Sequence, residues 1–283
     1  MRSTRFLTSM SDLRGSTHAA ACVAVRGGAP LDSLLTRGEQ RRLVREARDW
    51  YLNVHAGNVT RQGTCVVATA GPPGAGKSSV LPAAVPDLGS RLVIDPDTVK
   101  DYLARWCTEH GAYYDDLLAT VLPDGGTLRP LELSPLLQTM STEVANAVRR
   151  DALAQRMDIV VEATMASPAY GERLLLSLAK ADYRALLIVS VETDQQTAHA
   201  RAVERWWTGR QAEPELGGRL VLPETIDAAY PGTRSASACR TNARNLTETI
   251  RAGGSAIEHV TIAEYDDGAL ARLDADPPRA LDA

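Results

Sequence analysis

Short apolar runs are spaced along the middle and end of the chain. Four of them cover residues 65–70, 91–97, 158–164 and 184–194, and "AIEHVTIAEYDDG" alternates like a last strand. Helical periodicity separates these runs: after Lys77, from Pro135 to about Leu153 with Ser134 as N-cap, at 170–181, and from about Asp194 to Trp207. Strands that alternate with helices predict an α/β fold with a doubly wound parallel sheet flanked by helices.

The two ends of the chain are less clearly patterned. Residues 1–35 have weak periodicity, and the next stretch predicts an amphipathic helix with Leu43, Ala47, Trp50 and Tyr51 on one side. The end beyond 265 is rich in Asp, Pro and Ala and has little to bury. We therefore expect an N-terminal extension at 1–58 with one helix, a main domain at 59–265 and a flexible tail at 266–283.

Composition limits the class of protein. The chain has 283 residues, 44% of them apolar, and a net charge of −4, so it has no global basic field for nucleic acid or an anionic membrane. No apolar stretch reaches the roughly 18 residues that a membrane span needs. The four cysteines lie far apart, so we expect reduced thiols in a cytoplasmic protein and neither a zinc site nor a disulfide framework.

The segment "CVVATAGPPGAGKSSV" at 65–80 carries the most specific chemistry. It fits G-x-x-x-x-G-K-[ST] directly after a strand, a context in which backbone N–H groups and a helix N-terminus surround phosphates. Lys77 is expected on the outer phosphates of the ligand, and the Ser78 hydroxyl on a magnesium ion. The predicted nucleotide-binding residues are Gly71, Gly74, Ala75, Gly76, Lys77, Ser78 and Ser79.

Acidic side chains follow two of the later strands, at the edge where open α/β sheets bind ligands. In "VIDPDTVK", Asp97 is the predicted base for an attacking hydroxyl, and a helix N-cap is its alternative role. In "VVEATM", Glu162 and Thr164 are predicted to coordinate magnesium or to bind a substrate hydroxyl, with helix capping again the alternative.

Arginines dominate the basic residues, since only three of the 31 are lysines. Arg201 and Arg205 lie one helical turn apart in "AHARAVERWWTGR" and suit a transferring phosphate, with a solvated basic face as the plain alternative. The segment "TGRQAEPELGGRLVLPETIDAAY" is polar and contains glycine and arginine, so it predicts either an arginine-bearing mobile lid or a surface loop.

Taken in order, "GPPGAGKSS", "VIDPDTVK", "MSTEV", "VVEATM", "VERWW" and "GGRLVLPE" resemble the zeta toxin family over roughly residues 60–265. The resemblance implies a P-loop kinase that uses ATP and magnesium to phosphorylate the sugar of UDP-N-acetylglucosamine, and a small antitoxin protein that holds it inactive. It implies catalytic roles for Lys77, Asp97, Arg205 and Arg219. It also implies that Asp97, Glu143, Glu162 and Thr164 line the sugar-nucleotide site, and the spacing leaves Arg201 and Arg210 as rivals for phosphate contact.

Two departures from the family pattern concern the acceptor. Ala163 stands where the family commonly has glycine, and the connection from Asp97 to Glu143 is long. The acceptor therefore stays open between a sugar nucleotide, another small molecule such as an antibiotic or a nucleoside, and a nucleic-acid end. A regulatory ATPase that transfers to no acceptor is a further alternative. Nucleic acid is a secondary hypothesis, and we expect any antitoxin to be a separate chain.

Overall fold

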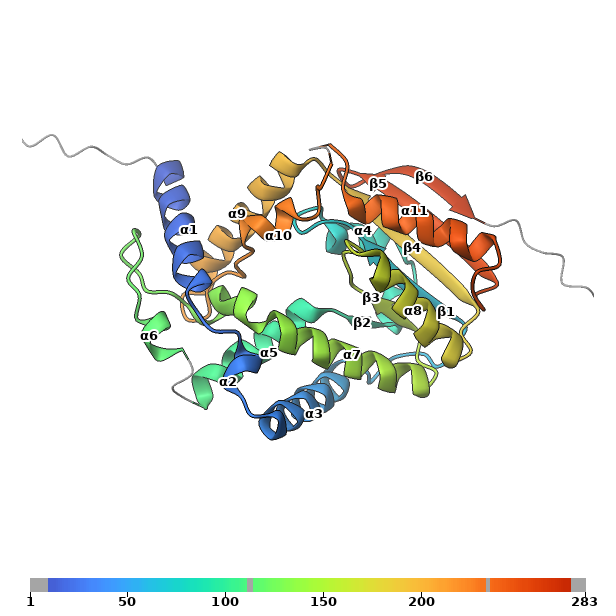
Figure 1. Ribbon diagram of the computed structural model, residues 1–283, viewed down its shortest axis with the longest axis horizontal. Coiled ribbons are helices and arrows are strands. Elements are labelled where there is room, and N and C mark those ends of the chain that lie inside the picture. Colours follow the sequence, from blue (N-terminus) through green and yellow to red (C-terminus); the bar gives the residue numbers. More distant parts are fainter. Residues whose placement is uncertain (1–9, 111–113, 233–234, 276–283) are drawn as a thin grey trace, which may run out of the picture.

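A six-stranded sheet organises the protein and lies in the right half of the view in Figure 1. The computed structural model describes residues 10–110, 114–232 and 235–275. The strand order is β2-β3-β1-β4-β5-β6, with β1 to β5 parallel and β6 antiparallel to β5. The predicted α/β fold with a doubly wound parallel sheet is confirmed. The strands are β1 Cys65–Ala70, β2 Leu92–Ile94, β3 Ile159–Val161, β4 Ala185–Glu192, β5 His259–Asp266 and β6 Ala269–Ala275.

Helices cover both faces of this sheet. Val66 and Ala68 of β1 join a core with α7, α8 and α11, whereas Val67 points to the other face and packs near α4. Two 3-10 segments, η1 Leu88–Ser90 and η2 Pro130–Leu137, complete the connections. The helices are α1 Met10–Arg26, α2 Leu31–Leu34, α3 Arg37–His55, α4 Lys77–Ala84, α5 Pro96–Glu109, α6 Asp115–Leu118, α7 Gln138–Ala154, α8 Pro168–Lys180, α9 Gln195–Ala212, α10 Pro223–Asp227 and α11 Ala238–Arg251.

The described part of the N-terminal extension, residues 10–58, contains three helices, where the sequence predicts one. Ala21 and Val25 of α1, Leu31 of α2 and Leu43 of α3 are all buried in the main core. The expectation of a single helix in this extension is therefore wrong, because α1 and α2 are helices as well. The buried face of α1 consists of small side chains, so its hydrophobic pattern along the sequence is faint.

Two further boundaries differ from the sequence interpretation. β6 pairs with β5 at positions where the sequence predicts a flexible tail, and residues 276–283 lie outside the described part of the chain. Ser134 is not an N-cap: it lies inside η2, where its hydroxyl donates to the Leu131 carbonyl, and α7 begins only at Gln138.

A buried ion cluster joins α9 to the segment before α7. The fully buried Arg210 donates from Nε to Asp124 Oδ2 at 2.8 Å and from Nη1 to Glu132 Oε1 at 2.8 Å. Glu132 is also fully buried and accepts from Trp206 Nε1 at 3.0 Å. Its guanidinium group is buried and already bonded to two carboxylates, so Arg210 has a structural role. It is therefore not available to contact a phosphate.

We expect Arg210→Ala to lower the free energy of unfolding by about 3–5 kcal/mol, because it leaves buried carboxylates without a counter-charge. Urea unfolding followed by circular dichroism measures this. Arg201→Ala is the control: Arg201 pairs with Asp267 at 3.3 Å on the surface, and both side chains are largely exposed. Its loss should cost less than about 1 kcal/mol. Equal destabilisation by the two substitutions would contradict the structural role of Arg210.

Candidate functional site

The glycine-rich loop connects β1 to α4. Gly71 and Gly74 have positive φ angles of 153° and 82°, and a Cβ at either position would meet a carbonyl oxygen, of Val191 or Ala198, at 2.3 Å. Only glycine fits at both places. Gly76 caps α4 in the left-handed region, with a φ of 89°, so the helix begins at the next residue. The sequence therefore builds a strand, a tight loop and a helix N-terminus in direct succession.

Lys77 folds back over this loop. Its ammonium group donates to the carbonyl oxygens of Gly71 at 2.9 Å and Pro72 at 3.1 Å. Burial lowers the pKa of Lys77. An anion in the loop would offer the ammonium a charged partner in place of two neutral carbonyls. Of the other predicted loop residues, Ala75 is buried, whereas Ser78 and Ser79 are exposed at the first turn of α4.

The end of β3 lies beside the loop. Gly71 N–H donates to the carbonyl of Thr164 at 3.0 Å, and the Ser78 hydroxyl donates to Glu162 Oε2 at 3.2 Å. The side chain of Thr164 has a local role here, because its hydroxyl accepts from the N–H of Ala166 at 3.3 Å. Glu162 and the loop therefore form one site, although they are far apart in the sequence.

The end of β2 carries two aspartates with different roles. Asp95 caps α5: its carboxylate accepts from Asp97 N at 2.9 Å and from Thr98 Oγ1 at 3.2 Å. The capping role considered for Asp97 thus belongs to Asp95. The Asp97 carboxylate instead accepts from Lys100 Nζ at 3.1 Å and lies 3.9 Å from Arg205 Nη2.

The three carboxyl groups at these strand ends differ in how readily they ionise. Burial opposes the ionisation of Asp97, but nearby cations, Lys100 first, outweigh it and lower its pKa to about 2. Burial, followed by the neighbouring Asp95 charge, raises the pKa of Glu162 to about 7. Burial and the charge of Asp97 also raise the pKa of Asp95. Asp97 is therefore the most readily ionised of the three.

The predicted arginines separate into two groups. Arg205 approaches Asp97, and Arg219 donates from Nε to Asp101 Oδ1 at 2.8 Å on the same helix, α5. Arg219 also contributes to the low pKa of Asp97. Arg201 points elsewhere, to Asp267. The structure thus brings Arg205 and Arg219 to the site and leaves Arg201 and Arg210 outside it.

Glu143 lies apart from these residues. It is exposed on α7 and lines a surface hollow with residues of α3, namely Arg37, Gln40, Arg41 and Val44. Within the described ranges, the structure does not join Glu143 to the loop or to the ends of β2 and β3. Its assignment to the acceptor site therefore rests on the family resemblance alone.

Tyr51 of α3 is a site residue that the sequence does not reveal. Its buried hydroxyl donates to the carbonyl of Val93 at 2.7 Å and accepts from the N–H of Asp95 at 3.0 Å. It therefore holds the turn between β2 and α5 that carries the aspartates. The sequence places Tyr51 only on an apolar helix face. Lys100 and Asp101 were also missed, although their spacing of three and four residues from Asp97 puts them on one face of α5.

Oxygen donors at the site suit magnesium. The Ser78 hydroxyl and the Glu162 carboxylate adjoin the loop, and hard cations prefer such ligands. Among the described residues there is no group of three His, Cys, Asp or Glu side chains that could hold a metal ion. Magnesium bound with a nucleotide needs only one or two protein ligands, since phosphates and water complete its shell.

Comparison with solved structures supports the fold. The chain is similar to a structure from the PezAT chromosomal toxin–antitoxin system of Streptococcus pneumoniae, with a TM-score of 0.54 and 10% identity, over 84% of this chain and 81% of that one. It is also similar to the native AvrRxo1-ORF1:-ORF2 complex, with a TM-score of 0.53 and 14% identity, over 86% of this chain and 70% of that one. At such low identities these similarities establish the fold alone.

Further comparisons address the family. No curated protein matches the chain. Residues 48–269 match the family model described as Zeta toxin. Separately, within the described residues, no helix has the length and apolar character that crossing a membrane requires. The family match spans most of the chain and contains the loop, the strand ends and both site arginines. The chain therefore belongs to the zeta toxin family, whose members are ATP-dependent phosphotransferases.

Proposed function

We propose that the protein transfers the γ-phosphoryl group of ATP to a hydroxyl of a sugar nucleotide such as UDP-N-acetylglucosamine. One observation carries the proposal: the loop with Lys77 adjoins Glu162 at the end of β3, and Asp97 follows the neighbouring strand β2, with Arg205 Nη2 3.9 Å from its carboxylate. A cation on the phosphates beside an ionised carboxylate for the attacking hydroxyl is the arrangement that phosphoryl transfer to an alcohol uses.

The donor side rests on the loop. Its N–H groups and Lys77 would hold the outer phosphates of ATP, with Ser78 as a magnesium ligand. Magnesium would supply charge neutralisation on the phosphates. A structure similar in fold, the AvrRxo1-ORF1:-ORF2 complex with ATP, supports ATP as the nucleotide; its TM-score is 0.50 and its identity 14%.

Asp97 would act mainly by orientation. A carboxyl group with a pKa of about 2 is a weak base, so it holds the substrate O–H by a hydrogen bond better than it removes the proton early. This suffices for phosphoryl transfer, because the loose transition state has little bonding to the attacking oxygen. Arg205 and Arg219 flank the same position and would neutralise the charge that develops on the transferred group.

The acceptor side has weaker support. Glu162 and Thr164 adjoin the loop, but Glu143 lies apart, and Ala163 and the long connection before α7 distinguish this chain from the family pattern. We propose that the protein is a cytoplasmic toxin held inactive by a separate antitoxin chain. The solved structures of similar fold come from a toxin–antitoxin system and from a two-protein complex, which supports a protein partner.

The first test is mass spectrometry of the protein incubated with magnesium-ATP and UDP-N-acetylglucosamine, beside Lys77→Ala. We expect a product heavier by one phosphoryl group with the wild type only, because Lys77 is needed to hold the phosphates. If ADP forms without this product, the sugar-nucleotide proposal is wrong. A panel of antibiotics, nucleosides and nucleic-acid ends then separates another kinase from an ATPase that has no acceptor.

Asp97→Asn should lower the turnover number by about a hundredfold or more, the usual size of the effect when a group on the attacking hydroxyl is lost. Binding of ATP should change little, because Asp97 lies outside the loop. Steady-state kinetics and a fluorescent ATP analogue measure the two quantities. A turnover number near that of the wild type would exclude the role assigned to Asp97.

Tyr51→Phe should lower the turnover number by about tenfold or more, because a slight displacement of the turn misplaces Asp97. Tyr183→Phe is a matched control: Tyr183 is equally buried and its hydroxyl donates to the carbonyl of Met157 at 2.7 Å, away from the site. Each change should cost about 1–3 kcal/mol of stability by leaving a buried polar group unpaired. Only Tyr51→Phe should reduce turnover, with the KM for ATP preserved; equal activity in both variants would refute the positioning role.

A further inference from the structure

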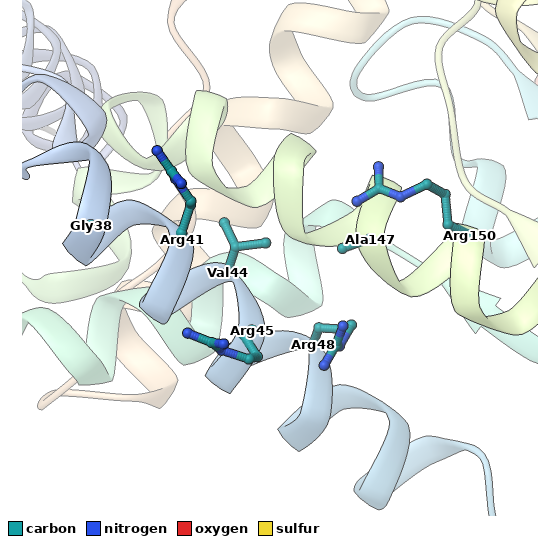
Figure 2. Close-up of a pocket in the computed structure, with 7 residues that line it drawn as sticks. All are labelled: Gly38, Arg41, Val44, Arg45, Arg48, Ala147 and Arg150. Atoms are coloured by element: carbon teal, nitrogen blue, oxygen red, sulfur yellow. The ribbon is translucent and has the colours of Figure 1, made fainter.

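An arginine-lined groove lies between α3 and α7, on elements that do not form the phosphate-binding loop. Its volume is about 480 Å³. Val44 of α3 and Ala147 of α7 lie at its centre, and arginines surround them (Figure 2). We call this the α3/α7 groove. Its lining residues are Gly38, Arg41, Val44, Arg45, Arg48, Ala147 and Arg150.

The spacing of these residues along the chain creates the groove. Arg41, Arg45 and Arg48 follow one another by four and three residues, which places them on one face of α3. Ala147 and Arg150 are likewise one turn apart on the face of α7 that meets α3. Like charges one turn apart repel one another, so this arrangement weakens the isolated helix unless an anion offsets it.

Among the residues that the structure describes, three of the four arginines have no anionic partner. Arg48 contacts Asp49 at 2.6 Å and Asp151 at 3.3 Å. In the part of the chain that the structure describes, Arg41, Arg45 and Arg150 form no ion pair. Elsewhere arginines are commonly paired with carboxylates, as in the Arg244–Glu264 pair, where Nε and Oε1 are 2.6 Å apart. The groove is therefore a place where three arginines without an ion pair lie close together.

We propose that the α3/α7 groove is a second anion site that binds a compact ligand with at least two phosphate groups. One guanidinium group can donate two parallel hydrogen bonds to a phosphate. Four guanidinium groups around one hollow therefore offer more donors than a single phosphate group can accept. The proposal depends on neither the reaction nor the acceptor proposed for the loop.

Charges at the ends of the groove favour a compact ligand over a nucleic acid. Glu143 lines the adjoining hollow at one end, and Asp49 and Asp151 lie beside Arg48 at the other. A long phosphate backbone that continued past either end would meet these carboxylates, on a chain whose net charge is −4. A ligand confined to the hollow contacts only the arginines and the short apolar floor.

Calorimetric titration with inorganic tripolyphosphate tests the proposal, at near-physiological salt and on a Lys77→Ala background that weakens binding to the loop. The triple variant Arg41→Gln/Arg45→Gln/Arg150→Gln removes no observed contact, and we expect it to bind at least about tenfold more weakly. A control variant, Arg61→Gln/Arg105→Gln/Arg173→Gln, removes the same charge from exposed positions elsewhere. Its affinity should stay within about twofold.

Two results would overturn the proposal. Equal loss of affinity in both triple variants would show that tripolyphosphate senses only the overall charge. Binding of a glutamate-rich peptide as tight as that of tripolyphosphate, with the same loss in the groove variant, would assign the surface to an acidic protein segment. With Lys77 intact, the tighter of the ATP-binding steps, which belongs to the loop, should be the same in the groove variant and the wild type, which shows that the variant is folded and that the two sites are separate.

Discussion

Three carboxyl groups have to share one desolvated edge of the sheet, because β1, β2 and β3 are parallel neighbours and their carboxyl ends coincide. Each carboxyl group has different partners, which reduces the repulsion between their charges. Asp95 binds backbone N–H and hydroxyl donors as a helix cap, Asp97 faces cations, and Glu162 accepts a hydrogen bond from a serine hydroxyl. One edge thus offers a fixed negative charge and, beside it, a carboxyl group whose charge an incoming cation would favour.

The cations that balance this edge come from distant parts of the chain, and buried packing sets where they lie. Arg205 is on the same helix as Trp206 and Arg210, whose contacts with Glu132 fix α9 against η2. Gly218 lies directly against this helix, since a Cβ there would meet the Trp206 carbonyl at 1.9 Å. The segment with Arg219 is therefore packed on α9. The two site arginines are positioned by one buried cluster that never touches the site.

The sequence predicted those elements whose conformation is determined by neighbouring residues in the chain. The apolar run before Gly71, the glycine spacing and the lysine specify the strand, loop and helix without help from the rest of the chain. Roles that depend on distant packing were not predictable: the sequence could not decide whether Asp95 or Asp97 caps α5, or that Arg210 is buried. β6 was missed because a largely exposed edge strand needs few apolar residues: residues 269–273 are all exposed, Leu270 and Leu273 among them.

The hydroxyl of Tyr51 has a consequence for the sheet as a whole. β2 is the outer strand on its side and has only three residues. Leu92 N–H and the Ile94 carbonyl bond toward β3, so the Val93 carbonyl between them faces outward, where Tyr51 occupies it. An unpaired outer strand is a template on which a second chain can add a strand. The helix α3, which the sequence places in an extension outside the main domain, thus protects the protein against edge-to-edge aggregation.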